Sequence, residues 1–146
     1  VKLNKYQLDK SSLHPELLEW IKNNIVYEFT KASYSRSLDI DSDTLGPHTD
    51  RSRAWVLEYL LDGGGHDHCT VFYKHKNTNF NLTRPCFVNY SDCNEVERVQ
   101  VPLQVWTLQN TQILHSIENI PHIRCGIYIG FEKKPYIINN NDIYDL

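Results

Sequence analysis

The stretch LGPHTDRSRAW contains two side chains that could coordinate one metal ion. His48 and Asp50 are separated by a single residue, and alternate residues of extended backbone point to the same side. His115, far downstream in NTQILHSI, adds a second imidazole. Two imidazoles and one carboxylate make the facial set that holds ferrous iron and leaves coordination positions open. We therefore predict a metal site built from His48, Asp50 and His115.

Arg124 follows His115 by nine positions and is the candidate for binding an anion near that metal. Its planar guanidinium can grip a carboxylate at two points, whereas lysine offers only a point charge. Alternation along the predicted strand 123–131 places Arg124 on a face with Tyr128 and two glycines, opposite an apolar face. A buried arginine needs an opposing anion. We expect a ligand carboxylate or an acidic side chain to face it; the alternative is a place on a solvent-facing sheet.

A second pair of histidines, His66 and His68 in GGGHDHC, has the His-x-His frame of cupin metal sites. The cupin pattern expects a glutamate a few residues after the second histidine, but the following residues here are CTVFYK. Because that acid is missing, we predict that His66 and His68 lie in a solvated turn. A cupin-like metalloprotein using these two histidines is kept as an alternative.

The elements that must position these residues are mainly β-strands. An amphipathic helix is expected near the start, in SSLHPELLEWIKNNI, with Ser12 as its N-cap and Pro15 in its first turn. Short runs rich in β-branched and aromatic residues then predict strands at 25–35, 54–61, 69–74, 86–90, 95–101, 104–110, 111–117 and 123–131. The polar stretch 36–48 is expected to be a mobile loop. This density of strands predicts a jelly-roll barrel with one N-terminal helix.

Length and composition favour a single domain over residues 1–146, because 146 residues suit one core. The net charge of -3 provides no basic stripe, so nucleic acid is not an expected partner. No apolar run is long enough to span a bilayer. The four cysteines have no disulfide spacing, so we expect them to be reduced packing residues in a cytoplasmic protein.

The order His48-Thr-Asp50, His115, Arg124 resembles the signature of the iron(II)- and 2-oxoglutarate-dependent dioxygenases. The likeness covers residues 45 to 132, and AWVLEYLLDGGG with CTVFY is similar to paired strands of the prolyl-4-hydroxylase-like members. The resemblance implies a double-stranded β-helix with a barrel core over about 26–132. It also implies that His48, Asp50 and His115 bind Fe(II), that Arg124 binds the far carboxylate of 2-oxoglutarate, and that dioxygen takes part.

The resemblance further implies hydrogen bonds to that carboxylate from Thr70 and from Tyr59 or Tyr128. The implied reaction hydroxylates a C–H bond and releases succinate and carbon dioxide. The primary substrate is unknown, although a peptidyl or amino-acid group suits the prolyl-hydroxylase likeness. Arg51 and Arg53 are equally suited to meeting an anionic substrate and to forming salt bridges on the rim. A non-catalytic jelly-roll binding module is a further alternative.

Overall fold

The computed structural model describes residues 3–8, 12–25, 31–37, 44–82, 85–138 and 143–146. Its elements are β1 (Leu3–Leu8), α1 (Pro15–Asn24), β2 (Lys31–Ser37), β3 (Leu45–Thr49), β4 (Trp55–Gly63), β5 (Cys69–His75), β6 (Cys86–Phe87), η2 (Tyr90–Asp92), β7 (Cys93–Val99), β8 (Trp106–Asn110), β9 (His115–Glu118), β10 (Arg124–Phe131) and β11 (Ile143–Asp145). The predicted mainly β fold with one N-terminal helix is confirmed at this level.

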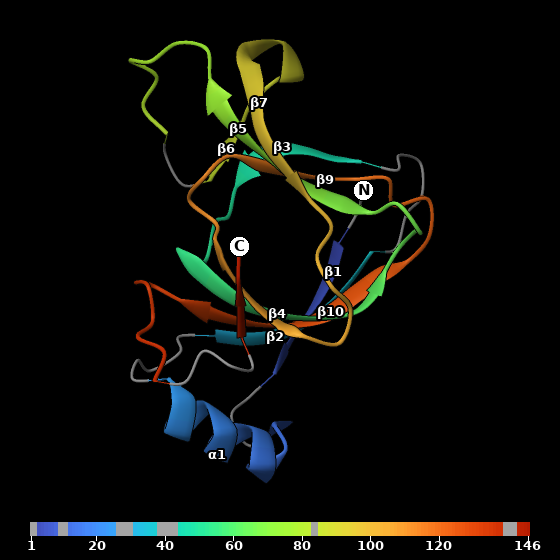
Figure 1. The fold of residues 1–146 in the computed structure, drawn as a ribbon, viewed down its shortest axis with the longest axis vertical. Helices are drawn as coiled ribbons and strands as arrows, with labels where there is room; N and C mark the ends of the chain where they lie inside the picture. The colour runs from blue at the N-terminus through green and yellow to red at the C-terminus, as the bar shows by residue number, and fades with distance from the viewer. Residues whose placement is uncertain (1–2, 9–11, 26–30, 38–43, 83–84, 139–142) are drawn as a thin grey trace.

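The strands form two sheets, which face each other as two layers in Figure 1. The six-stranded sheet has the order β1-β2-β10-β4-β8-β11, and the five-stranded sheet has the order β6-β3-β9-β5-β7. The antiparallel pairs are nested along the chain, because β2 pairs with β10, β3 with β9, β4 with β8, and β5 with β7. Distant parts of the sequence are thereby brought together, as the site requires.

The main hydrophobic core lies between α1 and the outer face of the six-stranded sheet (Figure 1). Ile21 of the helix packs with Leu57, Leu108, Ile129 and Phe131, which are all at most 4% exposed. Since side chains alternate along a strand, the neighbours of these core residues point between the two sheets. The interior between the sheets is therefore lined by a different set of residues from the apolar core.

The predicted N-terminal helix is present and has Pro15 in its first turn, but it begins later than predicted and has a different N-cap. His14 is the N-cap, and its Nδ1 accepts a hydrogen bond from the backbone N–H of Glu16 at 3.2 Å. Ser12 lies outside α1, in a short 3-10 turn, so the assignment of Ser12 as the cap is wrong. A histidine ring can replace a hydroxyl here because capping needs only an acceptor within reach of the first N–H groups.

The predicted loop over residues 36–48 is corrected in part. Residues 36 and 37 are the end of β2. Residues 45–49 form β3, which pairs with β6 on one side and β9 on the other. Residues 38–43 lie outside the described residues. The segment Leu45–Thr49 contains a glycine and a proline, which mask its strand character, and tertiary pairing with two neighbours decides its conformation. As a result, His48 lies on a strand.

Candidate metal centre

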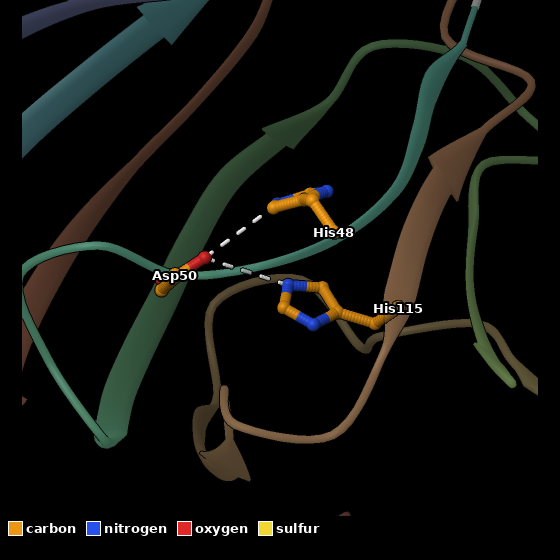
Figure 2. A group of neighbouring side chains, drawn as sticks. All are labelled: His48, Asp50 and His115. Carbon is orange, nitrogen blue, oxygen red and sulfur yellow. Dashed lines mark ion pairs between the residues drawn. The ribbon is translucent and has the colours of Figure 1, made fainter. Parts of the chain in front are cut away.

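His48, Asp50 and His115 come together at one end of the five-stranded sheet (Figure 2). His48 and His115 are directly opposite each other on the antiparallel strands β3 and β9. Asp50 follows β3, where its backbone N–H donates to the Thr111 carbonyl at 3.0 Å. Oδ1 of Asp50 is 3.5 Å from Nε2 of His48 and 3.6 Å from Nε2 of His115. One ligand atom from each residue therefore lies within 4.8 Å of the others.

Both imidazole rings are oriented by their own strands. Nδ1 of His48 is 2.8 Å from the Gly46 carbonyl, and Nδ1 of His115 is 2.8 Å from the Ile113 carbonyl. A carbonyl oxygen only accepts, so each Nδ1 is the donor, and in a neutral ring Nε2 keeps its lone pair. Two such lone pairs cannot face the Asp50 oxygen directly, so a proton or a metal ion must lie between each Nε2 and Oδ1. Metal-binding histidines are oriented by backbone carbonyls in this way.

Asp50 divides its two oxygens between two tasks. Oδ1 faces the histidines, while Oδ2 accepts a hydrogen bond from Nε of Arg53 at 2.6 Å. Burial alone would raise the pKa of Asp50, but His115, His48 and Arg53 together outweigh burial and hold that pKa far below its ordinary value. Asp50 is therefore an ionised, oriented carboxylate at neutral pH, as a metal ligand must be.

The ligand atoms of His48, Asp50 and His115 suit a divalent transition metal. Their donor set is two nitrogens and one oxygen, the ligands that such ions accept. His48 and His115 are buried and Asp50 is half-buried, so an ion held there would be shielded on the protein side. The group can therefore hold a metal ion, and the described residues contain no other such group of three or more His, Cys, Asp or Glu ligands.

These residues form part of the wall of a cavity of about 420 Å³. The wall draws on both sheets, which explains why it combines strands that are distant in sequence. Its lining comprises Ser33, Leu45, His48, Thr49, Asp50, Arg51, Arg53, Val56, Glu58, Thr70, Pro85, Phe87, Gln109, Thr111, His115, Ile117, Arg124 and Tyr128. The structure therefore brings the predicted Arg124 and Thr70 to the same cavity as the metal group.

Arg124 is buried in this wall and is already held by an acidic side chain. Its Nη2 lies 3.1 Å from Oε1 of Glu58, and the two residues are 4% and 3% exposed. Nη1 of Arg124 donates to the Gly63 carbonyl at 3.3 Å and lies 3.4 Å from Nδ1 of His68. Glu58 was not predicted, although an acid in the apolar strand AWVLEYLL was the available signal. An acidic side chain therefore faces Arg124, as one of the stated expectations has it, and the burial of Arg124 contradicts the solvent-facing alternative.

Tyr59 is not brought to the cavity. Its ring centroid lies 5.1 Å from that of Trp106, and it lines a separate pocket beside α1. The cause is strand alternation: Glu58 points between the sheets, so its neighbour Tyr59 points away from them. Tyr128, the other tyrosine considered, does line the cavity. Burial and the nearby Glu58 raise the pKa of Tyr128 above its usual range, and the Arg53 guanidinium lies 5.0 Å above its ring.

The prediction for the second histidine pair is wrong for one member. His66 is exposed, as expected, but His68 is buried against Arg124. Burial and the adjacent Arg124 charge lower the pKa of His68. Gly63 makes room for this ring, because a Cβ at that position would collide with His68. The two histidines therefore differ in environment, and neither belongs to the metal group found among the described residues.

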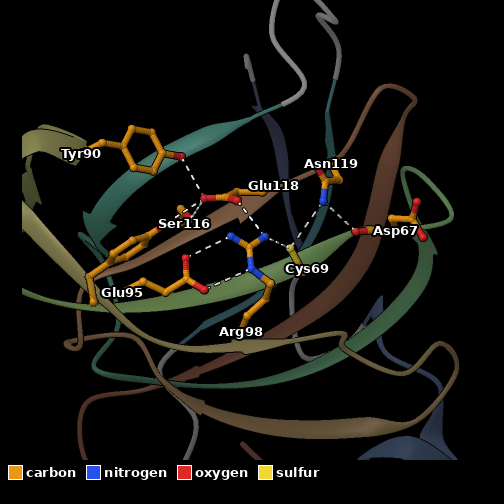
Figure 3. Close-up of polar contacts among 9 residues, drawn as sticks. Asp67, Cys69, Tyr90, Glu95, Arg98, Ser116, Glu118 and Asn119 are labelled. Carbon is orange, nitrogen blue, oxygen red and sulfur yellow. Dashed lines mark hydrogen bonds and ion pairs between the residues drawn. The ribbon is translucent and has the colours of Figure 1, made fainter.

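A second polar cluster lies on β5, β7 and β9 (Figure 3). Glu118 accepts hydrogen bonds from the Tyr73 hydroxyl at 2.7 Å, from Ser116 at 3.0 Å and from Arg98 at 3.0 Å. Burial would raise the pKa of Glu118, but these donors outweigh burial and lower it. Nη1 of Arg98 also lies 3.1 Å from the sulfur of Cys69. Cys69, like the other three cysteines, is free, as expected.

A scan against protein-family models, a search of curated proteins and a search of solved structures each returned no match for this chain. Within the described part of the chain, no helix is both long enough and apolar enough to cross a membrane.

Proposed function

We propose that this chain is an Fe(II)- and 2-oxoglutarate-dependent dioxygenase that hydroxylates a C–H bond. One observation carries the proposal: Nε2 of His48 and Nε2 of His115 both face Oδ1 of Asp50, with each Nδ1 fixed by a carbonyl. Two imidazoles and one carboxylate are the set associated with non-haem Fe(II) oxygenases. The resemblance in the order of His48, Asp50, His115 and Arg124 points to the same class.

The proposed scaffold is a double-stranded β-helix whose core spans about residues 26–132. It is supported by the inner strand orders, β2-β10-β4-β8 in one sheet and β3-β9-β5-β7 in the other. From β2 to β5 successive strands alternate between the two sheets, and from β7 to β10 they alternate again. A long hairpin wound into a barrel has this nested pattern. The first part of the proposed core, residues 26–30, lies outside the described residues.

In this proposal the chain's own residues bind and orient the reactants. His48, Asp50 and His115 hold the ion from one side, and Arg53 keeps the Asp50 carboxylate in position through Oδ2. Arg124 and Thr70 line the same cavity and can donate hydrogen bonds to the far carboxylate of the cosubstrate. The bound iron, cosubstrate and dioxygen supply an oxidising reaction that releases succinate and carbon dioxide.

Two exposed residues of the cavity lining are available to the primary substrate of the proposed reaction. The prolyl-hydroxylase likeness favours a peptidyl or amino-acid group. Phe87 lies beside the metal group, with its ring centroid 5.6 Å from that of His48, and the residue is 74% exposed. Arg51 is exposed on the same cavity. An aromatic ring and a cation are therefore available to an entering substrate.

The proposal is tested by turnover with Fe(II) and 2-oxoglutarate. Succinate formation is measured in the wild type and in His48→Ala, Arg124→Ala and His66→Ala variants. We expect the first variant to lose turnover and the second to require much more 2-oxoglutarate, while His66→Ala remains active because His66 lies outside the cavity. Unchanged turnover in His48→Ala would exclude the proposed centre, and loss confined to His66→Ala would favour the cupin-like alternative.

A further inference from the structure

Glu58 and Arg124 form a buried ion pair in the wall of the cavity. They lie on the adjacent strands β4 and β10, with Nη2 and Oε1 separated by 3.1 Å and with at most 4% of either residue exposed. A carboxylate held in this environment neutralises the guanidinium almost completely, because the pair is poorly screened by water. An incoming anion therefore meets a salt bridge at this wall.

The other charges of the described lining do not change this balance. Arg53 is bound to Asp50 at 2.6 Å, so that pair is also neutral. Arg51 is exposed and screened by solvent. The wall around Arg124 thus differs from a simple cationic site, in which the only strong partner of the guanidinium would be the ligand.

We propose that Glu58 competes with the ligand's carboxylate for Arg124 and so weakens the binding of dicarboxylates. The inference rests on the proposed function, because it concerns the cosubstrate end of the same cavity. A ligand carboxylate must share the guanidinium with Glu58 or displace it, and two carboxylates at one cation repel each other. Glu58 acts through Arg124 and is a positioning residue, not a catalytic one.

This role makes stability and affinity change in opposite directions. Replacing Glu58 with glutamine leaves the Arg124 charge buried without its carboxylate, which destabilises the ligand-free protein. The same change leaves the guanidinium available to a ligand carboxylate, which increases affinity. A purely structural role would make both properties worse. A loss of stability together with a gain of affinity therefore distinguishes competition for Arg124 from a purely structural role.

The test uses glutarate as the probe, with the full chain and without any metal, so its result does not depend on iron binding or turnover. Glutarate affinity is measured by titration calorimetry at neutral pH for the wild type and Glu58→Gln, with thermal unfolding of each. We expect Glu58→Gln to bind glutarate at least roughly tenfold more tightly, a change typical of removing a competing charge. Its unfolding temperature should be lower than that of the wild type.

Three further variants sharpen the comparison. Glu58→Asp, with a shorter carboxylate, should give an intermediate gain, which keeps the test informative if Glu58→Gln does not fold. The double variant Glu58→Gln, Arg124→Met removes both buried charges and should lose the gain. Glu95→Gln makes the same change in net charge at an exposed pair with Arg98 and should bind glutarate as the wild type does.

The inference is overturned if both Glu58 variants bind glutarate no more tightly than the wild type, or if the gain survives in the double variant. An equal gain of glutarate affinity in Glu95→Gln would also overturn the inference, because the gain would then come from the change in net charge and not from Arg124. Failure of the proposed function would be seen separately, as absence of succinate formation in an iron-loaded wild type whose glutarate binding still responds to Glu58.

Discussion

Replacing His115 with glutamine should remove most of the affinity of the protein for a divalent metal. His115 is 4% exposed and contributes one of the three ligand atoms, its Nε2, which lies 3.6 Å from Oδ1 of Asp50. Glutamine has comparable reach but lacks the imidazole nitrogen and its bond to the Ile113 carbonyl. Loss of an outer hydrogen bond to a ligand costs about 10–100-fold in metal affinity. Loss of the ligand itself should cost at least about 100-fold.

That loss has a measurable effect on stability. At a metal concentration about 100 times the dissociation constant, binding stabilises the wild type by about 2.7 kcal/mol. With affinity about 100-fold weaker, the same concentration only equals the dissociation constant, and the stabilisation falls to about 0.4 kcal/mol. For a chain of this length, the metal-induced rise in unfolding temperature should fall from about 8 °C to about 1 °C.

The assay is thermal unfolding under anaerobic conditions, with and without Fe(II), so each variant serves as its own metal-free reference. This design separates metal affinity from any stability that the substitution itself removes. His66→Gln is the matched control, because His66 is exposed and outside the cavity. The reasoning is refuted if Fe(II) raises the unfolding temperature of His115→Gln as much as it does that of His66→Gln.

Three other substitutions test the surrounding structure. Glu118 has a lower pKa in the folded protein than in the unfolded chain, so its ionisation contributes stability above about pH 4.5 that is lost as the pH falls. In urea unfolding, the wild type should therefore be more stable than Glu118→Gln above about pH 4.5, and this difference should shrink below it. Gly63→Ala should cost about 1–3 kcal/mol in denaturant unfolding, because the added methyl displaces His68. Leu108→Ala should cost about 2–5 kcal/mol in the same assay, whereas Leu103→Ala, at a position 48% exposed, should cost far less.

The residues that the sequence identifies best are those governed by alternation along a strand. His48 and Asp50 were expected to share a side because one residue separates them, and they do meet at one point. Arg124 and Tyr128 were expected on one face of their strand, and both line the cavity. These predictions needed only the period of a strand, which does not depend on knowing its neighbours.

The predictions that failed depended on which neighbours a residue has. The strand β3 was expected to be a loop because its own residues are poor strand formers, and its pairing with β6 and β9 overrides that preference. Tyr59 is predicted to contact the ligand, but its neighbour Glu58 occupies the inward position on β4 instead. The sequence predicts the partner of Arg124 only as a carboxylate, of a ligand or of the protein, since pairing Glu58 with Arg124 requires the register of β4 and β10.

Each metal ligand is oriented by a residue close to it in sequence, so the orientation of the ligands does not depend on the rest of the cavity wall. The rings of His48 and His115 each bind a carbonyl two residues earlier, and Asp50 binds Arg53 three residues later. The fold contributes the register of β3 and β9, since a slip of one residue would turn the side chains of β3 to the other face. Substitutions at Glu58 or elsewhere in the wall can therefore change what the cavity accepts while the three ligand atoms stay in place.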